Sequence, residues 1–125
     1  MAEDKARQLL PADAGNGPAG RAILDALLGA VKVVADAAYT LKAADNGKAL
    51  LFSSGDPVTV TVPPDLVTGY QVVIGQIGAG TVTMAEGAGV TINSDGDKRA
   101  ISARWLTAAV VNYAADTFLL AGSLA

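Results

Sequence analysis

Short runs of alternating apolar and polar residues, separated by glycine or proline, most constrain the fold of this chain. The run Val58-Thr59-Val60-Thr61-Val62 has a period of two, which predicts a strand with one buried and one wetter face. Pro63-Pro64 ends this strand, because proline cannot donate to a sheet ladder. Further runs at residues 70–77, 81–84 and 90–92 are separated by glycines. Short strands at this spacing predict an antiparallel β-sandwich or barrel.

The strand pattern continues on both sides of this central segment. Tyr39-Thr40-Leu41 begins it, a turn at Asn46-Gly47 follows, and residues 48–53 form the next strand. Residues 108–113 and 117–121 form a closing hairpin. The sequence therefore predicts a mainly β domain of about eight short strands over residues 39–125.

Residues 18–38 carry a helical pattern, and Pro18 suits the first turn of a helix. Leucines, valines and alanines recur at spacings of three and four, and the apolar stripe is wide. Such a helix can pack on its own sheet or against sister copies in a short bundle, and the pattern leaves both open. If it packs between copies, the candidate oligomerisation residues are Leu24, Leu27, Leu28 and Val31.

Residues 1–17 show no sustained periodicity and lead into the glycine-rich Gly15-Asn16-Gly17. A terminus of this composition is commonly disordered. The functional alternative is an extended arm that becomes ordered against a partner. Its apolar anchor would be Leu9, Leu10 and Pro11.

The composition favours an oligomer and disfavours two classes of partner. Hydrophobic residues make up 51% of the chain but aromatic residues only 5%, so each core side chain buries a modest area and subunit contacts would add to it. The net charge is −3, and nine lysines and arginines are scattered. No basic face is available for nucleic acid. Residues 19–38 carry four charges, which argues against a membrane span.

The residue types argue against catalysis, a cofactor and a bound metal. The chain has no histidine and no cysteine, so its serines lack the usual activating base. Residues 93–97 alternate side-chain oxygens as a calcium loop does, but Lys98 and Arg104 stand where that motif needs glycine and glutamate. The segment 75–80 lacks the Gly-Lys-Ser/Thr ending of a phosphate loop. We assign no catalytic, cofactor-binding or metal-ligating residue.

Trp105 is the single tryptophan of the chain. Residues 100–106 are expected to approach the core through Ile101, Trp105 and Leu106. A lone tryptophan belongs more often to a core than to a sugar-stacking surface, because of the large area that it buries.

Residues 39–125 resemble a module of tailed-bacteriophage virion proteins. The resemblance rests on Tyr39-Thr40-Leu41, residues 45–48, 58–63, 69–70, 78–83 and 89–93, and the ending 115–122. Phe118 stands where the module often has tryptophan. Related modules occur in head fibres, capsid decoration proteins and tail-fibre tips, commonly as homo-oligomers.

The resemblance implies a non-enzymatic virion structural protein, made in the host cytoplasm and placed on the capsid surface. We expect a capsid decoration or head-fibre subunit that forms a homo-oligomer, specifically a homotrimer. It would attach to the major capsid protein through its N-terminal region, with Leu9, Leu10 and Pro11 as the candidate capsid-attachment residues. The alternative is a receptor- or glycan-binding tip of a tail fibre.

Overall fold

The computed structural model describes residues 30–125, within which Lys32–Ala125 form one compact unit. This unit is mainly β, with strands in two sheets and two short 3₁₀ turns. The strands are β1 (Val31–Val34), β2 (Ala38–Thr40), β3 (Ala49–Phe52), β4 (Val58–Val62), β5 (Gln71–Gln76), β6 (Val82–Glu86), β7 (Thr91–Ser94), β8 (Thr107–Ala114) and β9 (Thr117–Gly122). The 3₁₀ turns are η2 (Ala43–Asp45) and η3 (Asp95–Asp97).

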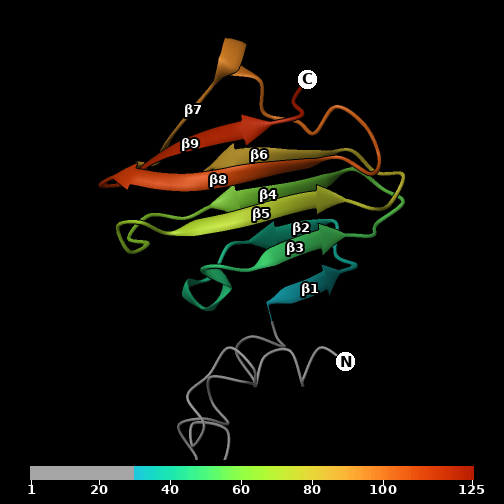
Figure 1. The fold of residues 1–125 in the computed structure, drawn as a ribbon, viewed down its shortest axis with the longest axis horizontal. Coiled ribbons are helices and arrows are strands. Elements are labelled where there is room, and N and C mark those ends of the chain that lie inside the picture. The colour runs from blue at the N-terminus through green and yellow to red at the C-terminus, as the bar shows by residue number, and fades with distance from the viewer. Residues whose placement is uncertain (1–29) are drawn as a thin grey trace, which may run out of the picture. The chain divides into compact units, whose positions relative to one another are not determined.

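The first six strands alternate between the two sheets (Figure 1). One sheet has six strands in the order β1-β3-β5-β8-β9-β7, and the other has three in the order β2-β4-β6. The chain therefore crosses from one sheet to the other after each strand from β1 to β6. Each time the chain comes back to a sheet, its new strand runs in the same direction as the previous strand of that sheet. β3 therefore pairs with β5 in parallel, and β4 pairs in parallel with both β2 and β6.

This winding makes a short β-solenoid whose later coils have a constant length. Ala49 pairs with Val73 and Val58 pairs with Val82, an offset of 24 residues in both sheets. The turns of these coils stack as well. The amides of Gly78 and Gly80 donate to Phe52 O and Ser54 O, each at 3.0 Å. A Cβ at either glycine would collide with the backbone of residues 53–56, so the stacking requires glycine there.

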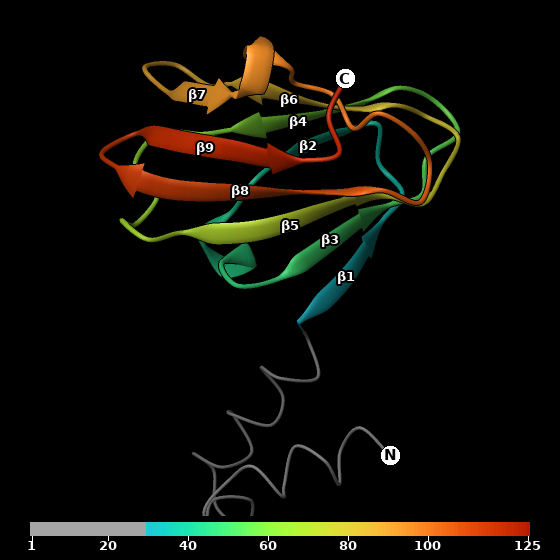
Figure 2. The same ribbon diagram turned by 45° about the horizontal axis from the view of Figure 1, so that its top comes forward.

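The last three strands close the solenoid at one end (Figure 2). β8 pairs antiparallel with β5 and turns back into β9, and β7 then pairs in parallel with β9. Beside β6, Ala100 bridges to Thr83 and Ile101 bridges to Leu124. At the other end, β1 and β2 are the outermost strands of their sheets. The described unit thus has one closed end and one open end.

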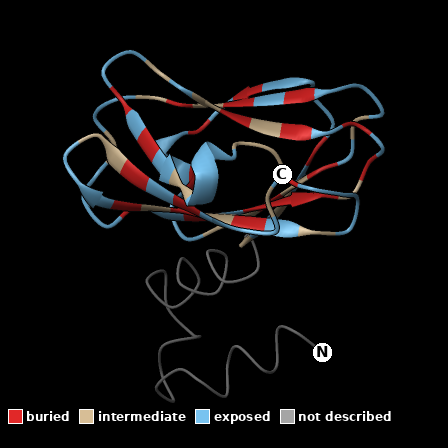
Figure 3. Ribbon diagram, turned by 90° about the horizontal axis from the view of Figure 1, so that it is seen from above, coloured by how far each residue is buried: buried red, intermediate tan, exposed pale blue. Residues whose placement is uncertain are grey.

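The core lies between the two sheets, which form two layers in Figure 3. Each strand contributes its inward side chains, as the period of two requires. The fully buried large side chains include Tyr70, Phe52, Phe118, Leu50, Ile74, Ile92, Leu120, Val58, Val60, Val62 and Val82.

The predicted mainly β fold is confirmed, but the antiparallel arrangement is wrong. β2–β4, β3–β5, β4–β6 and β7–β9 are parallel, whereas β5–β8 and β8–β9 are antiparallel. A period of two shows which face of a strand is buried, but it is the same in parallel and in antiparallel strands, so it does not predict strand direction. The predicted alternation of Val58–Val62 and the β8–β9 hairpin are confirmed.

The predicted helix over residues 18–38 is wrong in its last part. Residues 31–34 form β1, which neighbours β3 in the six-stranded sheet, and residues 38–40 form β2. Val31, Val33 and Val34 are β-branched, which lowers helix propensity and favours a pleated surface. The remainder of that helix, residues 18–29, and the arm at residues 1–17 lie outside the described residues.

Candidate interaction surface

The centre of the outer face of the six-stranded sheet is apolar. Inward side chains such as Leu50, Val72 and Val110 are buried in the core, so their neighbours along each strand point away from it. The central outward positions carry small and medium aliphatic side chains. Polar side chains occupy outward positions towards the strand ends and on β7, namely Gln71, Thr91, Asn93, Thr107, Tyr113 and Thr117. We define the apolar outer face as Val33, Ala49, Leu51, Val73, Ala109, Val111, Leu119 and Ala121.

The strand register joins these residues into rows across the sheet. Ala49, Val73, Ala109 and Ala121 are successive Cα partners in one row. In the next row Val111 and Leu119 are partners, and this pair lies between Gln71 and Asn93. The apolar outer face is therefore continuous rather than a set of scattered residues.

The outer face of the three-stranded sheet provides an internal comparison. Its outward positions on β2, β4 and β6 include Thr40, Thr59, Thr61 and Thr83. Threonine and valine both suit strands, so strand propensity does not require aliphatic side chains at exposed positions. The aliphatic character of the other face needs a different explanation, and large exposed apolar patches mark interaction sites.

The outward positions of the six-stranded sheet carry no charged side chain. The one charged residue within its six strands is Lys32 in β1. The Lys32 ammonium donates to the hydroxyl of Tyr39 at 3.2 Å, and Tyr39 belongs to the other sheet. Lys48 lies just before β3, at the edge of a shallow depression of about 130 Å³ that Gln71, Val73, Ala109 and Val111 also line.

A glycine lets the apolar outer face lie flat. Leu51 and Gly75 are Cα partners in the β3–β5 pair. A Cβ at Gly75 would lie 2.6 Å from Cδ2 of Leu51. The Leu51 side chain therefore lies across the Gly75 backbone instead of projecting beside another side chain.

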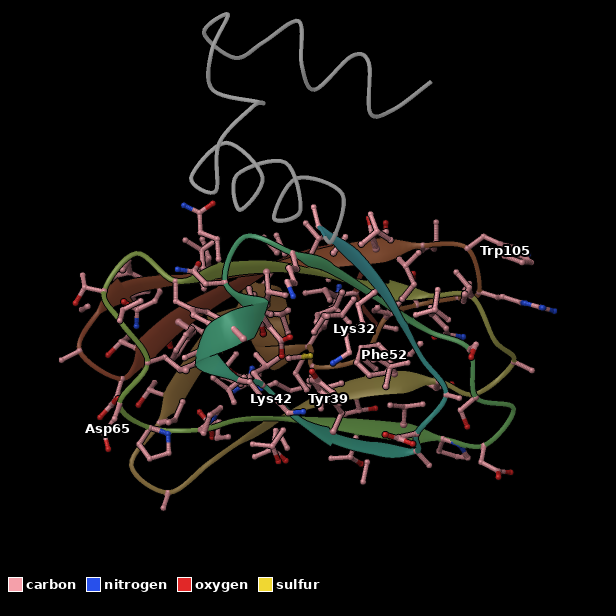
Figure 4. All side chains as sticks on the ribbon, turned by 90° about the horizontal axis from the view of Figure 1, so that it is seen from below. Lys32, Tyr39, Lys42, Phe52, Asp65 and Trp105 are labelled. Atoms are coloured by element: carbon pink, nitrogen blue, oxygen red, sulfur yellow. The ribbon has the colours of Figure 1, made fainter. Side chains whose placement is uncertain are left out.

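A polar cluster covers the core at the open end, seen directly in Figure 4. The Tyr39 hydroxyl donates to the carboxylate of Asp45 at 2.7 Å, and the Lys42 amide donates to the same oxygen at 3.1 Å. The ammonium groups of Lys32 and Lys42 lie 5.3 and 5.4 Å from the Tyr39 ring centroid, within the range of cation–π attraction. Charged side chains at such an edge oppose pairing with a further strand.

Burial and the Asp45 carboxylate raise the pKa values of two tyrosines at this end of the core. Burial, with the hydrogen bond to Asp45 and its negative charge, raises the pKa of Tyr39 to about 12. Burial also raises the pKa of Tyr70, and the charge of Asp45 adds to it. The Tyr70 hydroxyl donates to the carbonyl of Lys42 at 2.8 Å. Both phenols stay neutral at ordinary pH and hold the η2 turn in place.

Trp105 is on the surface, so the expectation that it belongs to the core is wrong. Its side chain is 69% exposed, and its backbone has a φ of +73°, which is rare for a bulky residue. Its amide donates to Gln76 O at 2.7 Å. The Arg104 guanidinium lies 4.4 Å from the centroid of the indole ring. The other two residues expected to approach the core, Ile101 and Leu106, do pack in or against it.

The described residues hold no obvious chemical site. In residues 30–125, no three histidine, cysteine or acidic side chains gather closely enough to hold a metal ion. Asp95 and Asp97 lie in the exposed η3 turn, where Lys98 approaches Asp95 at 4.0 Å. The amides of Gly78 and Gly80 are already used by neighbouring carbonyls, so they are turn residues. In this part of the chain, no helix is long and apolar enough to cross a membrane.

One of the predicted site residues lies within the described part of the chain. Val31 lies in β1 and is 60% exposed. The other predicted residues, Leu9, Leu10, Pro11, Leu24, Leu27 and Leu28, lie outside the described residues. Sequence reasoning missed the apolar outer face. The available signal was the loss of alternation at Val72-Val73-Ile74 and at residues 108–111, where apolar residues occupy both faces.

Comparison with known proteins does not place the chain in a family. No protein-family model matches it, and no curated protein matches it.

Proposed function

We propose that this protein is a non-enzymatic structural subunit of a bacteriophage virion, a capsid decoration or head-fibre protein. It functions by assembling on the capsid surface as a homo-oligomer, specifically a homotrimer. The observation that carries the proposal is the apolar outer face, which is continuous over neighbouring strands and has no charged residue at its outward strand positions. Such a surface suits permanent association better than chemistry. The resemblance of residues 39–125 to virion modules supports the same function.

In this proposal the N-terminal region and the β domain have different roles. Residues 32–125 contain their own core of inward side chains from both sheets. They can therefore form a rigid body on the shell. The N-terminal region binds the major capsid protein, with Leu9, Leu10 and Pro11 as the apolar anchor. An extended arm of this kind makes its contacts when a partner supplies the other surface.

Binding of variants to virus particles that lack the subunit tests this function. The test variant is Leu9→Asp/Leu10→Asp in the full chain, and the matched control is Ala6→Asp/Ala12→Asp. Both add two charges to the same arm, but only the first removes the anchor. We expect the control to reach wild-type occupancy and the test variant to fall at least tenfold below it. Equal occupancy of both variants would refute the anchoring role, and no binding by wild type would refute the proposed function.

A second candidate, a receptor- or glycan-binding tip of a tail fibre, is favoured by Trp105. An exposed indole offers the flat apolar surface on which sugar rings stack, and Arg104 beside it offers hydrogen-bond donors. Because Trp105 is the sole tryptophan, its fluorescence reports directly on this site. Saturable quenching by a host-surface glycan, lost in Trp105→Ala, would support the tip function. Unchanged fluorescence across a panel of such glycans would argue against it.

A further inference from the structure

We infer that Trp105 and Arg104 together bind an acidic oligosaccharide, one whose sugar rings carry carboxylates. The indole stacks on one sugar ring, and the guanidinium binds the carboxylate of a neighbouring ring. The inference goes beyond the assembly function. It rests on the glycan-binding function of the second candidate and specifies the chemical class of the ligand.

The stability of the fold does not account for a tryptophan at position 105. The side chain is 69% exposed and extends from the edge of the β unit in Figure 4, so it buries little apolar area. Its φ of +73° is unfavourable for any residue with a Cβ. Strained backbone of this kind is concentrated at binding and active sites, where it helps to hold a side chain in position.

Three hydrogen bonds to the end of β5 and the residue after it fix the pair in place. The Trp105 amide donates to Gln76 O at 2.7 Å, and the Gln76 amide donates to Leu106 O at 3.1 Å. Nε of Arg104 donates to Ile77 O at 2.9 Å. The guanidinium then lies 4.4 Å from the centroid of the indole ring. A site arranged before the ligand arrives loses less conformational entropy on binding.

This arrangement leaves one indole face and two nitrogens for a ligand. The guanidinium lies over one face of the indole, so the opposite face can contact the apolar face of a sugar ring. The two terminal nitrogens of Arg104 remain once Nε is bonded. In residues 30–125 they have neither a hydrogen-bond acceptor nor a nearby carboxylate. Such a planar fork binds a carboxylate through two parallel hydrogen bonds.

The geometry favours an oligosaccharide over an acidic peptide. Peptides bind along a free sheet edge or in a groove, but β8, which follows Trp105, has β5 and β9 on its two sides. A sugar ring in contact with the free indole face at about 4 Å lies about 8 Å from the guanidinium on the other face. A ring flat on the indole cannot reach around it with its own carboxylate, whereas a linked second ring can.

Titration of the full-length protein with oligosaccharides tests the inference. Trp105 fluorescence is the readout, because the chain has no other tryptophan. The probes are tetrasaccharides of galacturonate, glucuronate and mannuronate, each compared with its neutral methyl ester, which keeps the rings and removes the charge. We expect at least one acid to bind at least tenfold more tightly than its ester and than its own monosaccharide. Failure of all three acids to bind at about 10 mM would overturn the inference.

Substitutions at Arg104 separate its fork from its charge. Arg104→Gln should weaken binding of the acid to the level of the ester and leave binding of the ester unchanged. Arg104→Lys should weaken binding of the acid at least threefold, because an ammonium cannot make the paired hydrogen bonds. Lys98→Gln is the matched control, since it removes the same charge from the exposed η3 turn, and it should bind as wild type does. An equal loss in Arg104→Gln and Lys98→Gln would overturn the inference by showing a general charge effect.

The other outcomes distinguish this inference from the two proposed functions. Esters that bind as tightly as the acids would refute the role of Arg104 and leave the glycan-binding function standing. Fluorescence that no acid, ester or host-surface glycan changes would refute both. Binding of a sulfated oligosaccharide alone would refute carboxylate recognition. Arg104→Gln should reach wild-type occupancy on virus particles that lack the subunit, and reduced occupancy would overturn the inference by placing the pair against the capsid.

Discussion

The hydroxyl of Tyr39 donates a 2.7 Å hydrogen bond to the carboxylate of Asp45, which is only 2% exposed. Tyr39 lies in β2 and Asp45 ends the η2 turn, so the bond fixes the crossing from the three-stranded sheet to β3. The Lys32 ammonium, from the six-stranded sheet, donates to the same hydroxyl. A single phenol thus links both sheets and the turn between them at the open end of the core.

Tyr39→Phe should destabilise the protein by about 1–3 kcal/mol, because it removes a donor from a buried charged acceptor. Urea unfolding of the full chain measures this change. Tyr113→Phe is the matched control, since Tyr113 is 56% exposed and its hydroxyl accepts from Asn93 at 2.8 Å. We expect the control to change the unfolding free energy by less than about 0.5 kcal/mol. Equal effects of the two variants would show that the Asp45 contact does not stabilise the fold.

Stability should fall at high pH. The pKa of Tyr39 is about 12 in the folded protein against 10.0 for a free tyrosine. The unfolded state therefore loses its proton first, and the contribution of Tyr39 is complete below pH 10 and is lost as the pH rises towards 12. Tyr70 acts in the same direction. Urea unfolding between pH 8 and 12 should show the decline, with a shallower slope in Tyr39→Phe. An identical slope in that variant would contradict this explanation.

Gly80→Ala should destabilise the protein by about 1–3 kcal/mol, because the added methyl group has no room. Its Cβ would collide with the carbonyl of Asp56, and a backbone group cannot move aside as a side-chain tip can. Gly55→Ala is the control from the neighbouring coil, where nothing lies within 4 Å of the added Cβ. Thermal unfolding of both variants measures the difference. Equal melting temperatures would mean that the turns of successive coils do not stack as described.

Comparing two substitutions at Trp105 isolates the cost of its backbone conformation. Residues with a Cβ disfavour the observed φ of +73°, and glycine does not. Both Trp105→Ala and Trp105→Gly remove the indole and its contact with Arg104. We therefore expect the glycine variant to be more stable than the alanine variant by about 1 kcal/mol. If alanine were the more stable of the two, residue 105 would not hold a left-handed conformation in solution.

Some features of the fold follow from local sequence. Val58, Val60 and Val62 had to share a face because side chains alternate along a strand, and all three are buried. Leu51 points away from Leu50 and Phe52 for the same reason. Asn46-Gly47 predicted a turn, and Gly47 has a φ of +80°. These outcomes depend on neighbours in the chain, whose geometry the sequence specifies directly.

The candidate interaction surface could not be predicted in the same way. In Val72-Val73-Ile74 all three residues are apolar, yet Val72 and Ile74 are buried and Val73 is 40% exposed. Apolar residues on both faces of a strand do not reveal which face meets the core. Trp105 was missed for a related reason, because its exposure depends on a left-handed backbone and on the bond from its amide to Gln76.

The sequence by itself determined that the chain is mainly β, where several of its strands begin and end, and that histidine and cysteine chemistry is absent. Only the tertiary structure decided the direction of each strand and its neighbour in the sheet. The pairing of Val58 with Val82 joins residues 24 positions apart, and such a contact depends on how the intervening strand crosses to the other sheet. Local patterns act over a few residues, whereas sheet order and the apolar outer face arise from contacts that are distant in the chain.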